Sequence, residues 1–228
     1  MEAESKARRR DRVWGLLIVG TAFLAALSIS WWARGVSTPS EIEAPAPPTT
    51  EGVAGFPHKV DAVATLEAAR AATKRAELRG ISAYGVAADG TVDVSAAGRG
   101  INYSFASARG QGPQPPRPPG TLPRHEFCGR QHVRVNGTGL VADPDVPSAP
   151  CSPTMEPLPN PRCGPKQVWQ AAVRRGMPAD QLANITFFRS TSGPSWRFEL
   201  PSQRKTLVLY GDCERELTGS EAIDITPH

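Results

Sequence analysis

The 228-residue sequence contains none of the short motifs that mark the common enzyme classes. It has no nucleophile elbow, no paired-carboxylate motif and no glycine-rich loop for phosphates or dinucleotides. Histidine is also scarce, with four in the chain. His228 is the last residue and His58 ends a proline-rich segment, so His125 and His132 are the two plausible general bases. We therefore expect a protein without catalytic residues and without a cofactor.

The chain also lacks a strong excess of one charge once its first residues are set aside. Of the 26 basic and 22 acidic side chains, five and three lie in residues 1–32, so the following 196 residues carry 21 and 19. Such a balance provides no cationic surface for nucleic acid, which is therefore not an expected partner. The abundance of arginine, alanine and proline favours a GC-rich bacterial source.

One long apolar run is present, from Val13 to Trp32, and it contains no charged residue. Twenty helical residues at ~1.5 Å each match the ~30 Å core of a bilayer. Five basic residues precede the run, which predicts a cytoplasmic N-terminus. Trp14, Trp31 and Trp32 lie where interfacial anchors are expected. The sequence thus predicts a single-pass bacterial inner-membrane protein that contacts lipid through residues 13–32 and has a periplasmic or extracellular C-terminal domain.

Two other readings of this run stay open. Ser28-Ile29-Ser30 has the small residues of a signal-peptidase site, so the helix is alternatively cleaved after Ser30. The run is longer than the usual 7–15-residue core of a signal peptide, which favours the uncleaved anchor. Alternatively, the small residues of the run allow close packing against helices of a larger membrane complex.

Four cysteines lie beyond the apolar run: Cys128, Cys151, Cys163 and Cys213. An even number in an oxidising compartment predicts two disulfides, for which three connectivities exist. We favour Cys128 with Cys151 and Cys163 with Cys213, because each bond then closes one structural unit. Each bond is expected to contribute ~2–4 kcal/mol to stability.

Proline-rich segments divide the chain. The predicted order is a cytoplasmic tail (1–12), the transmembrane helix (13–32), a flexible proline-rich stalk (33–57), a first unit (58–145), a proline-rich connector (146–163), a second unit (164–214) and a C-terminal tail (215–228).

Each unit shows a helical pattern followed by short strands, so the predicted fold class is α+β with two weakly repeated helix plus antiparallel-sheet units. The helices are expected over 61–79 and 165–176, and the strands over 81–87, 91–94, 101–105, 132–135, 184–189, 196–200 and 206–210. Asp89-Gly90 and Asn136-Gly137 predict hairpin turns. Six aromatic residues are expected in the core: Tyr103, Phe105, Trp169, Phe187, Trp196 and Phe198.

A helix followed by a meander, with Asp89-Gly90 in the first turn and the aromatic strand Ser195-Trp196-Arg197-Phe198-Glu199-Leu200, resembles PepSY-type modules. The resemblance covers residues 60–106 and 164–211. These modules occur in exported bacterial proteins and are thought to bind or restrain partner proteins. The resemblance therefore implies protein binding, and it brings no catalytic residue with it.

The expected function is a non-enzymatic binding or assembly role in the bacterial envelope, with a protein partner. The alternative is an exported hydrolase or metal-binding enzyme that uses His125 and His132. His125, Cys128 and His132 lie within eight residues and have zinc-binding side chains, but an oxidised Cys128 is unable to ligate a metal. An enzyme is expected to place one of these histidines in a concave pocket beside a carboxylate or a hydroxyl.

Overall fold

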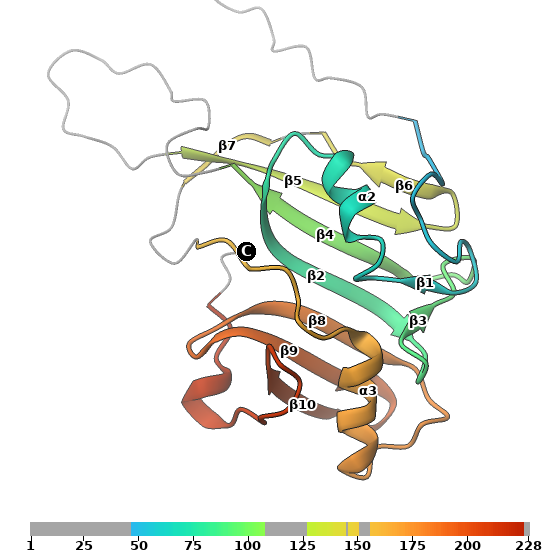
Figure 1. The fold of residues 1–228 in the computed structure, drawn as a ribbon, viewed down its shortest axis with the longest axis vertical. Helices are drawn as coiled ribbons and strands as arrows, with labels where there is room; N and C mark the ends of the chain where they lie inside the picture. Colours follow the sequence, from blue (N-terminus) through green and yellow to red (C-terminus); the bar gives the residue numbers. More distant parts are fainter. Residues whose placement is uncertain (1–46, 108–126, 145, 151–155, 226–228) are drawn as a thin grey trace, which may run out of the picture. The chain divides into compact units, whose positions relative to one another are not determined.

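The structure is a computed structural model that describes residues 47–107, 127–144, 146–150 and 156–225. These residues form strands, two α-helices and two 3-10 helices (Figure 1). The helices are α2 (Leu66–Ala71), α3 (Pro165–Arg174), η1 (Pro201–Gln203) and η2 (Gly219–Ala222). The strands are β1 (Val60–Asp61), β2 (Glu77–Val86), β3 (Thr91–Val92), β4 (Gly100–Ala106), β5 (Phe127–Asn136), β6 (Gly139–Ala142), β7 (Val146–Pro150), β8 (Ala183–Ser190), β9 (Gly193–Leu200) and β10 (Lys205–Tyr210).

The ten strands belong to one antiparallel sheet. Its main order is β10-β9-β8-β2-β4-β5-β6, with β7 paired to β5, and β3 paired to both β1 and β2. The central pair is β2 with β8, in which Ile81 lies opposite Phe187 and Ala83 lies opposite Ile185. Strands from the two halves of the chain therefore lie side by side in the middle of a continuous sheet.

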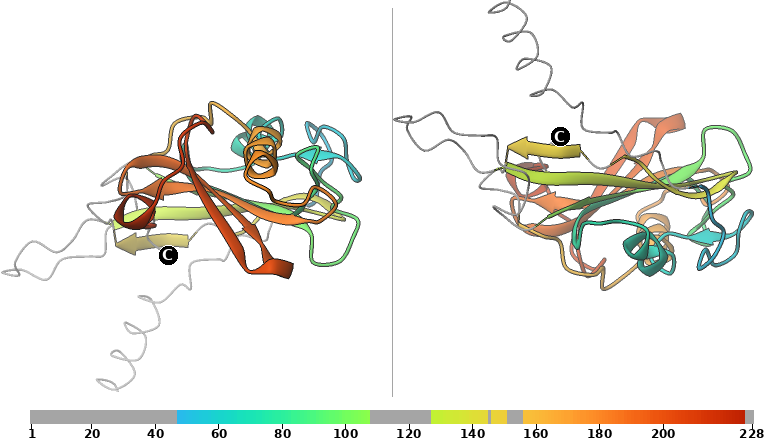
Figure 2. Two further views of the ribbon diagram at one scale, coloured as in Figure 1. Left: turned by 90° about the horizontal axis from the view of Figure 1, so that it is seen from below. Right: turned by 90° about the horizontal axis from the view of Figure 1, so that it is seen from above.

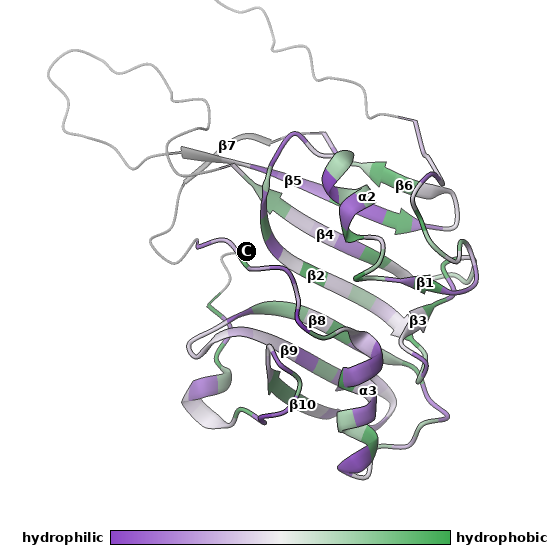
Figure 3. Cartoon of the chain, in the orientation of Figure 1, coloured by the Kyte–Doolittle hydropathy of each residue, from purple (hydrophilic) through white to green (hydrophobic). Residues whose placement is uncertain are grey.

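Both α-helices pack on the same face of this sheet (Figure 2). Helix α3 is amphipathic and places Trp169 in the core (Figure 3). The Trp169 ring lies edge-on to Phe198 with 4.8 Å between centroids, and its Nε1 donates a hydrogen bond of 3.1 Å to the Val86 carbonyl oxygen. The six aromatic residues predicted to form the core are at most 1% exposed, so that prediction is confirmed.

The local turn predictions are also confirmed. The Ala87 amide donates to the Thr91 carbonyl oxygen at 2.9 Å, which closes the Asp89-Gly90 hairpin between β2 and β3. Asn136 pairs with Gly139, so the Asn136-Gly137 turn joins β5 to β6. Helix α3 begins at the predicted Gly164-Pro165 sequence, and the Gln167 side chain accepts a hydrogen bond of 3.0 Å from the Gly164 amide.

The predicted α+β fold of two helix-plus-sheet repeats is wrong. The described residues form a mostly antiparallel β structure, and the helix expected over 61–79 is limited to Leu66–Ala71. Val60 at one end of that segment pairs with Val92, and Leu78 at the other end pairs with Phe105. Both Val60 and Leu78 are at most 1% exposed. Burial in the sheet therefore overrides the helix propensity of the alanine-rich segment.

The predicted inner-membrane localisation is corrected as well. Within the described ranges, no helix has the length and apolar character needed to cross a bilayer. Helix α2 has six residues and α3 has ten, whereas a membrane span needs about 20. The expected span from Val13 to Trp32, with Trp14 and Trp31, lies outside the described residues. The predicted single-pass topology therefore finds no support in this structure.

Segments at the two ends of the described chain pair with the outer strands of the sheet. Thr49 and Leu140 exchange backbone hydrogen bonds of 3.0 and 2.7 Å at β6. Glu216 forms a bridge with Leu209 of β10. Because Thr49 is paired here and Val53 is buried, the end of the segment predicted as a stalk packs on the sheet.

Candidate functional site

The face of the sheet opposite the helices has a pocket of about 290 Å³. Residues on this face alternate along the strands with core residues such as Ile81 and Tyr103, because successive side chains of a strand point to opposite faces. The side chains that border the pocket include Arg79, Ser82, Tyr84, Ser104, His132 and Thr186. They come from the neighbouring strands β2, β4, β5 and β8. We call this surface the open face.

Two irregularities in β2 enclose the centre of the open face. The register with β4 shifts between Leu78 and Gly80, so Arg79 is an extra residue without a partner in that ladder. The register with β8 shifts between Ala83 and Val86, where Gly85 has a φ of 71°. A β-bulge redirects side chains locally and needs such a glycine when the conformation is left-handed. The first bulge places Arg79 at the pocket, while Tyr84 reaches it through the regular alternation that it shares with Ser82.

Arg79 is an unusual side chain for a sheet because it is 6% exposed. Its Nη2 donates a hydrogen bond of 2.6 Å to Oε2 of Glu77. Its Nε and Nη1 have no hydrogen-bond partner among the described residues. Leaving a buried donor unsatisfied costs about 1–3 kcal/mol. Arg79 therefore makes the pocket a place where an acceptor from outside is energetically favoured.

Charges of both signs surround Arg79. Burial lowers the pKa of the Arg79 guanidinium, Glu77 opposes this shift, and Arg130 and Arg189 lower the pKa further by repulsion. The guanidinium nevertheless stays protonated at neutral pH, as arginine does in proteins. The pocket thus contains a buried positive charge next to two further arginines.

Asp224 is the acidic residue that borders the pocket. Its Oδ2 accepts a hydrogen bond of 3.0 Å from Nη2 of Arg197. The Arg197 guanidinium also lies over the Phe188 ring, 4.5 Å from its centroid. The negative charge of Asp224 is therefore balanced by Arg197 at the edge of the pocket.

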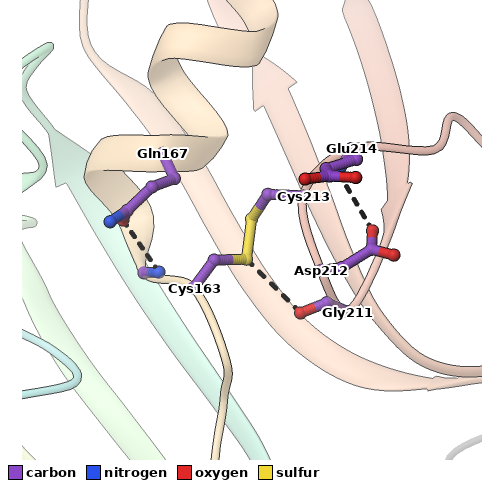
Figure 4. The surroundings of a disulfide bond; sticks show 7 residues. Cys163, Gln167, Gly211, Asp212, Cys213 and Glu214 are labelled. Atoms are coloured by element: carbon purple, nitrogen blue, oxygen red, sulfur yellow. Dashed lines mark hydrogen bonds between the residues drawn. A yellow bond between two sulfur atoms is a disulfide. The ribbon is translucent and has the colours of Figure 1, made fainter.

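The pairing of Cys163 with Cys213 is confirmed (Figure 4). The Cα atoms lie 6.2 Å apart, and the bond links the segment before α3 to the turn after β10. Sγ of Cys163 lies 3.4 Å from the Gly211 carbonyl oxygen. The predicted pairing of Cys128 with Cys151 stays a prediction, because Cys151 lies outside the described residues.

Of the two histidines proposed as catalytic or metal-binding residues, the structure describes His132. His132 is exposed on β5, borders the pocket and lies opposite Ser104 of β4. His125 lies outside the described residues, so the pair itself is untested. In the described part of the chain, no group of three or more metal-ligating side chains comes together. Trp14, Trp31 and Trp32 also lie outside it.

Arg79 and Tyr84 are not among the site residues predicted from the sequence. Arg79 stands directly before Gly80, at the end of the helix predicted over 61–79. A glycine within a strand pattern is also a signal of a bulge, and Gly80 and Gly85 both carry it. The long-range pairing of β2 with β8 decides between these interpretations.

Comparisons with protein-family models, curated proteins and solved structures found no match for this chain. The resemblance to PepSY-type modules therefore stays a prediction, and the function is argued from the geometry of the open face.

Proposed function

We propose that this protein is a non-enzymatic binding module that holds a segment of a partner protein on the open face of its sheet. The observation that carries the proposal is the pocket between the two bulges of β2, where Arg79 and Tyr84 border an uncovered part of the sheet. Tyr84 is 39% exposed, although large apolar rings are usually buried. Tyrosine and arginine are among the residue types that contribute most to binding interfaces.

The edges of the sheet support a face rather than an edge as the binding surface. An unpaired edge strand is a template for the addition of a partner strand. Here Thr49 pairs with Leu140 of β6, and the Leu217 amide donates a hydrogen bond of 2.8 Å to the Val208 carbonyl oxygen of β10. These segments of the chain itself compete with a partner strand at both positions.

A photo-crosslinking experiment tests the proposal. The crosslinking amino acid p-benzoylphenylalanine replaces Tyr84 in the full-length chain, and in a matched control it replaces Val173 of α3. Val173 is 42% exposed on the helix side of the sheet. We expect a discrete adduct with a protein of the source cells from position 84, and none from position 173.

A second variant shows whether the adduct depends on the pocket. Ser82→Arg places a long side chain at the centre of the open face, because Ser82 borders the pocket between the two bulges. The adduct from position 84 is expected to disappear in this variant. Adducts from position 173 alone, or an adduct from position 84 that Ser82→Arg leaves intact, would contradict the proposal.

A further inference from the structure

The donors of Arg79 define the chemistry that the open face lacks. Nε and Nη1 of this side chain are buried and have no acceptor among the described residues, while Nη2 is bonded to Glu77. Arg79 borders the pocket, so an acceptor bound there lies next to a charge that water solvates poorly. A charged oxygen acceptor gives the strongest hydrogen bond to such a donor.

We infer that the open-face pocket contains an oxyanion subsite anchored by Arg79, which takes a carboxylate side chain of the partner segment. This inference deepens the proposed function and rests on it. The partner is thus an acidic segment, recognised by charge at Arg79 and by an apolar side chain at Tyr84.

The charges around the pocket favour a ligand that brings its own carboxylate. Glu77 accepts a hydrogen bond from Nη2 of Arg79. Asp224, which borders the pocket, pairs with Arg197 at 3.0 Å, and Glu156 pairs with Arg189 at 3.2 Å. Among the described residues, no acidic side chain forms a hydrogen bond with Nε or Nη1 of Arg79, and a carboxylate from outside would supply a charged acceptor for them.

The spacing of the two bulges indicates the length of the segment. Arg79 and Tyr84 are five positions apart on β2, which corresponds to about 16 Å along a strand. An extended segment of about five residues covers that distance. Because side chains alternate along an extended segment, the acidic side chain is expected four residues away from the apolar side chain that contacts Tyr84.

The test is an NMR titration of the full-length ¹⁵N-labelled chain with sodium acetate, at constant ionic strength maintained with sodium chloride. Acetate is expected to shift the amide signals of Ser82, Asn102 and Ser104, which line the pocket. Arg79→Met is expected to weaken acetate binding at least about tenfold, because a charge-assisted hydrogen bond is lost. The control Arg174→Gln removes a charge from α3, on the other side of the sheet, and is expected to change nothing.

A second variant keeps the test decisive if Arg79→Met fails to fold. Ser104 lies opposite Gly80 on β2 and opposite His132 on β5, within the pocket. Ser104→Asp therefore supplies an internal carboxylate beside Arg79. It is expected to abolish acetate binding and to raise the melting temperature at neutral pH. Unchanged acetate binding in both variants would overturn the inference.

A parallel titration with inorganic phosphate distinguishes a carboxylate from a phosphorylated side chain. Binding of phosphate without binding of acetate would overturn the assignment to a carboxylate. The crosslink from position 84 separates this inference from the proposed function. If position 84 gives a crosslink but the wild-type chain does not bind acetate, the oxyanion subsite is contradicted and the proposed function is not. If the wild-type chain binds acetate but position 84 gives no crosslink, the proposed binding of a partner protein is contradicted.

Discussion

The two faces of the sheet are built from alternate residues of the same strands, yet they differ in almost every property. On the helix side, residues such as Ile101, Tyr103 and Phe105 of β4 are fully buried. On the open face, the intervening residues Asn102 and Ser104 are partly exposed and border a pocket. Because successive side chains of a strand point to opposite faces, one face of the sheet forms the core and the other stays accessible to a partner.

The bulges of β2 modify this division. A bulge inserts a position that escapes the alternation of side chains along a strand. Arg79 occupies such a position, whereas Tyr84 follows Ser82 in the regular alternation and pairs with Gly100 of β4. The open face therefore owes Arg79 to an irregularity of β2 and Tyr84 to regular pairing, and both residues border the pocket.

The largest expected effect comes from the covered face. Trp169→Ala removes a fully buried indole that contacts Phe198 and leaves the Val86 carbonyl without its donor. We expect a loss of about 3–5 kcal/mol in the free energy of unfolding, measured by urea denaturation. Tyr84→Ala on the open face is the matched control and is expected to cost about 1 kcal/mol or less. Equal losses in both variants would remove the contrast between the faces.

The disulfide comes next. Cys163→Ser combined with Cys213→Ser opens a link between residues 50 positions apart. The unfolded chain gains conformational freedom, so unfolding is expected to become easier by about 2–4 kcal/mol, as measured by urea denaturation. The pocket is formed by strands and contains neither cysteine, so acetate binding is expected to persist.

The same variant addresses the other predicted disulfide. Peptide mapping of the non-reduced double variant is expected to show Cys128 linked to Cys151. Free thiols at these two positions would contradict that pairing.

A smaller effect with the opposite sign is expected at Arg79. Arg79→Met, made together with Glu77→Gln so that no carboxylate is left without its partner, removes two buried donors that lack an acceptor among the described residues, so the free energy of unfolding is expected to rise by about 1–2 kcal/mol. Arg197→Met is the control, because Arg197 is paired with Asp224 and lies over Phe188. This variant is expected to lose about 1 kcal/mol. If the Arg79 variant loses as much free energy of unfolding as Arg197→Met, Arg79 contributes to the stability of the fold.

Much of the local structure could be predicted from the sequence. The Asp89-Gly90 and Asn136-Gly137 turns, the start of α3 at Pro165 and the aromatic core all depend on residues close in sequence or on strong apolar character. The pairing of Cys163 with Cys213 was favoured among three connectivities and is present.

The arrangement of the sheet could not be predicted in the same way. The pairing of Ile81 with Phe187 joins residues more than 100 positions apart, and no local pattern encodes it. That pairing turns two expected units into one sheet and extends β2 back to Glu77. The candidate site could not be predicted either, because Arg79 reaches the open face only when it belongs to a bulged strand.

The smallest expected effect lies in a turn that belongs to neither face. Hydrogen bonds from the Thr91 hydroxyl and amide, at 2.7 and 3.0 Å, lower the pKa of Asp89. A lowered pKa in the folded chain means that the stabilisation is complete above the unfolded value of about 3.9 and is lost as pH falls through the folded pKa. Asp89→Asn is therefore expected to cost less than about 1 kcal/mol at pH 7, since the carboxylate is exposed and screened.

The pH dependence distinguishes this contribution from a general loss of the turn. Urea denaturation of Asp89→Asn and of the wild-type chain is compared at pH 7 and at pH 2.5. We expect the difference between the two chains to be smaller at pH 2.5, because the stabilisation that comes with the lowered pKa of Asp89 is progressively lost as pH falls below the unfolded value. Acetate binding at the open face is expected to be unchanged by this variant at pH 7. A difference in the free energy of unfolding that is the same at both pH values would assign the effect to the shape of the Asn side chain instead of to charge.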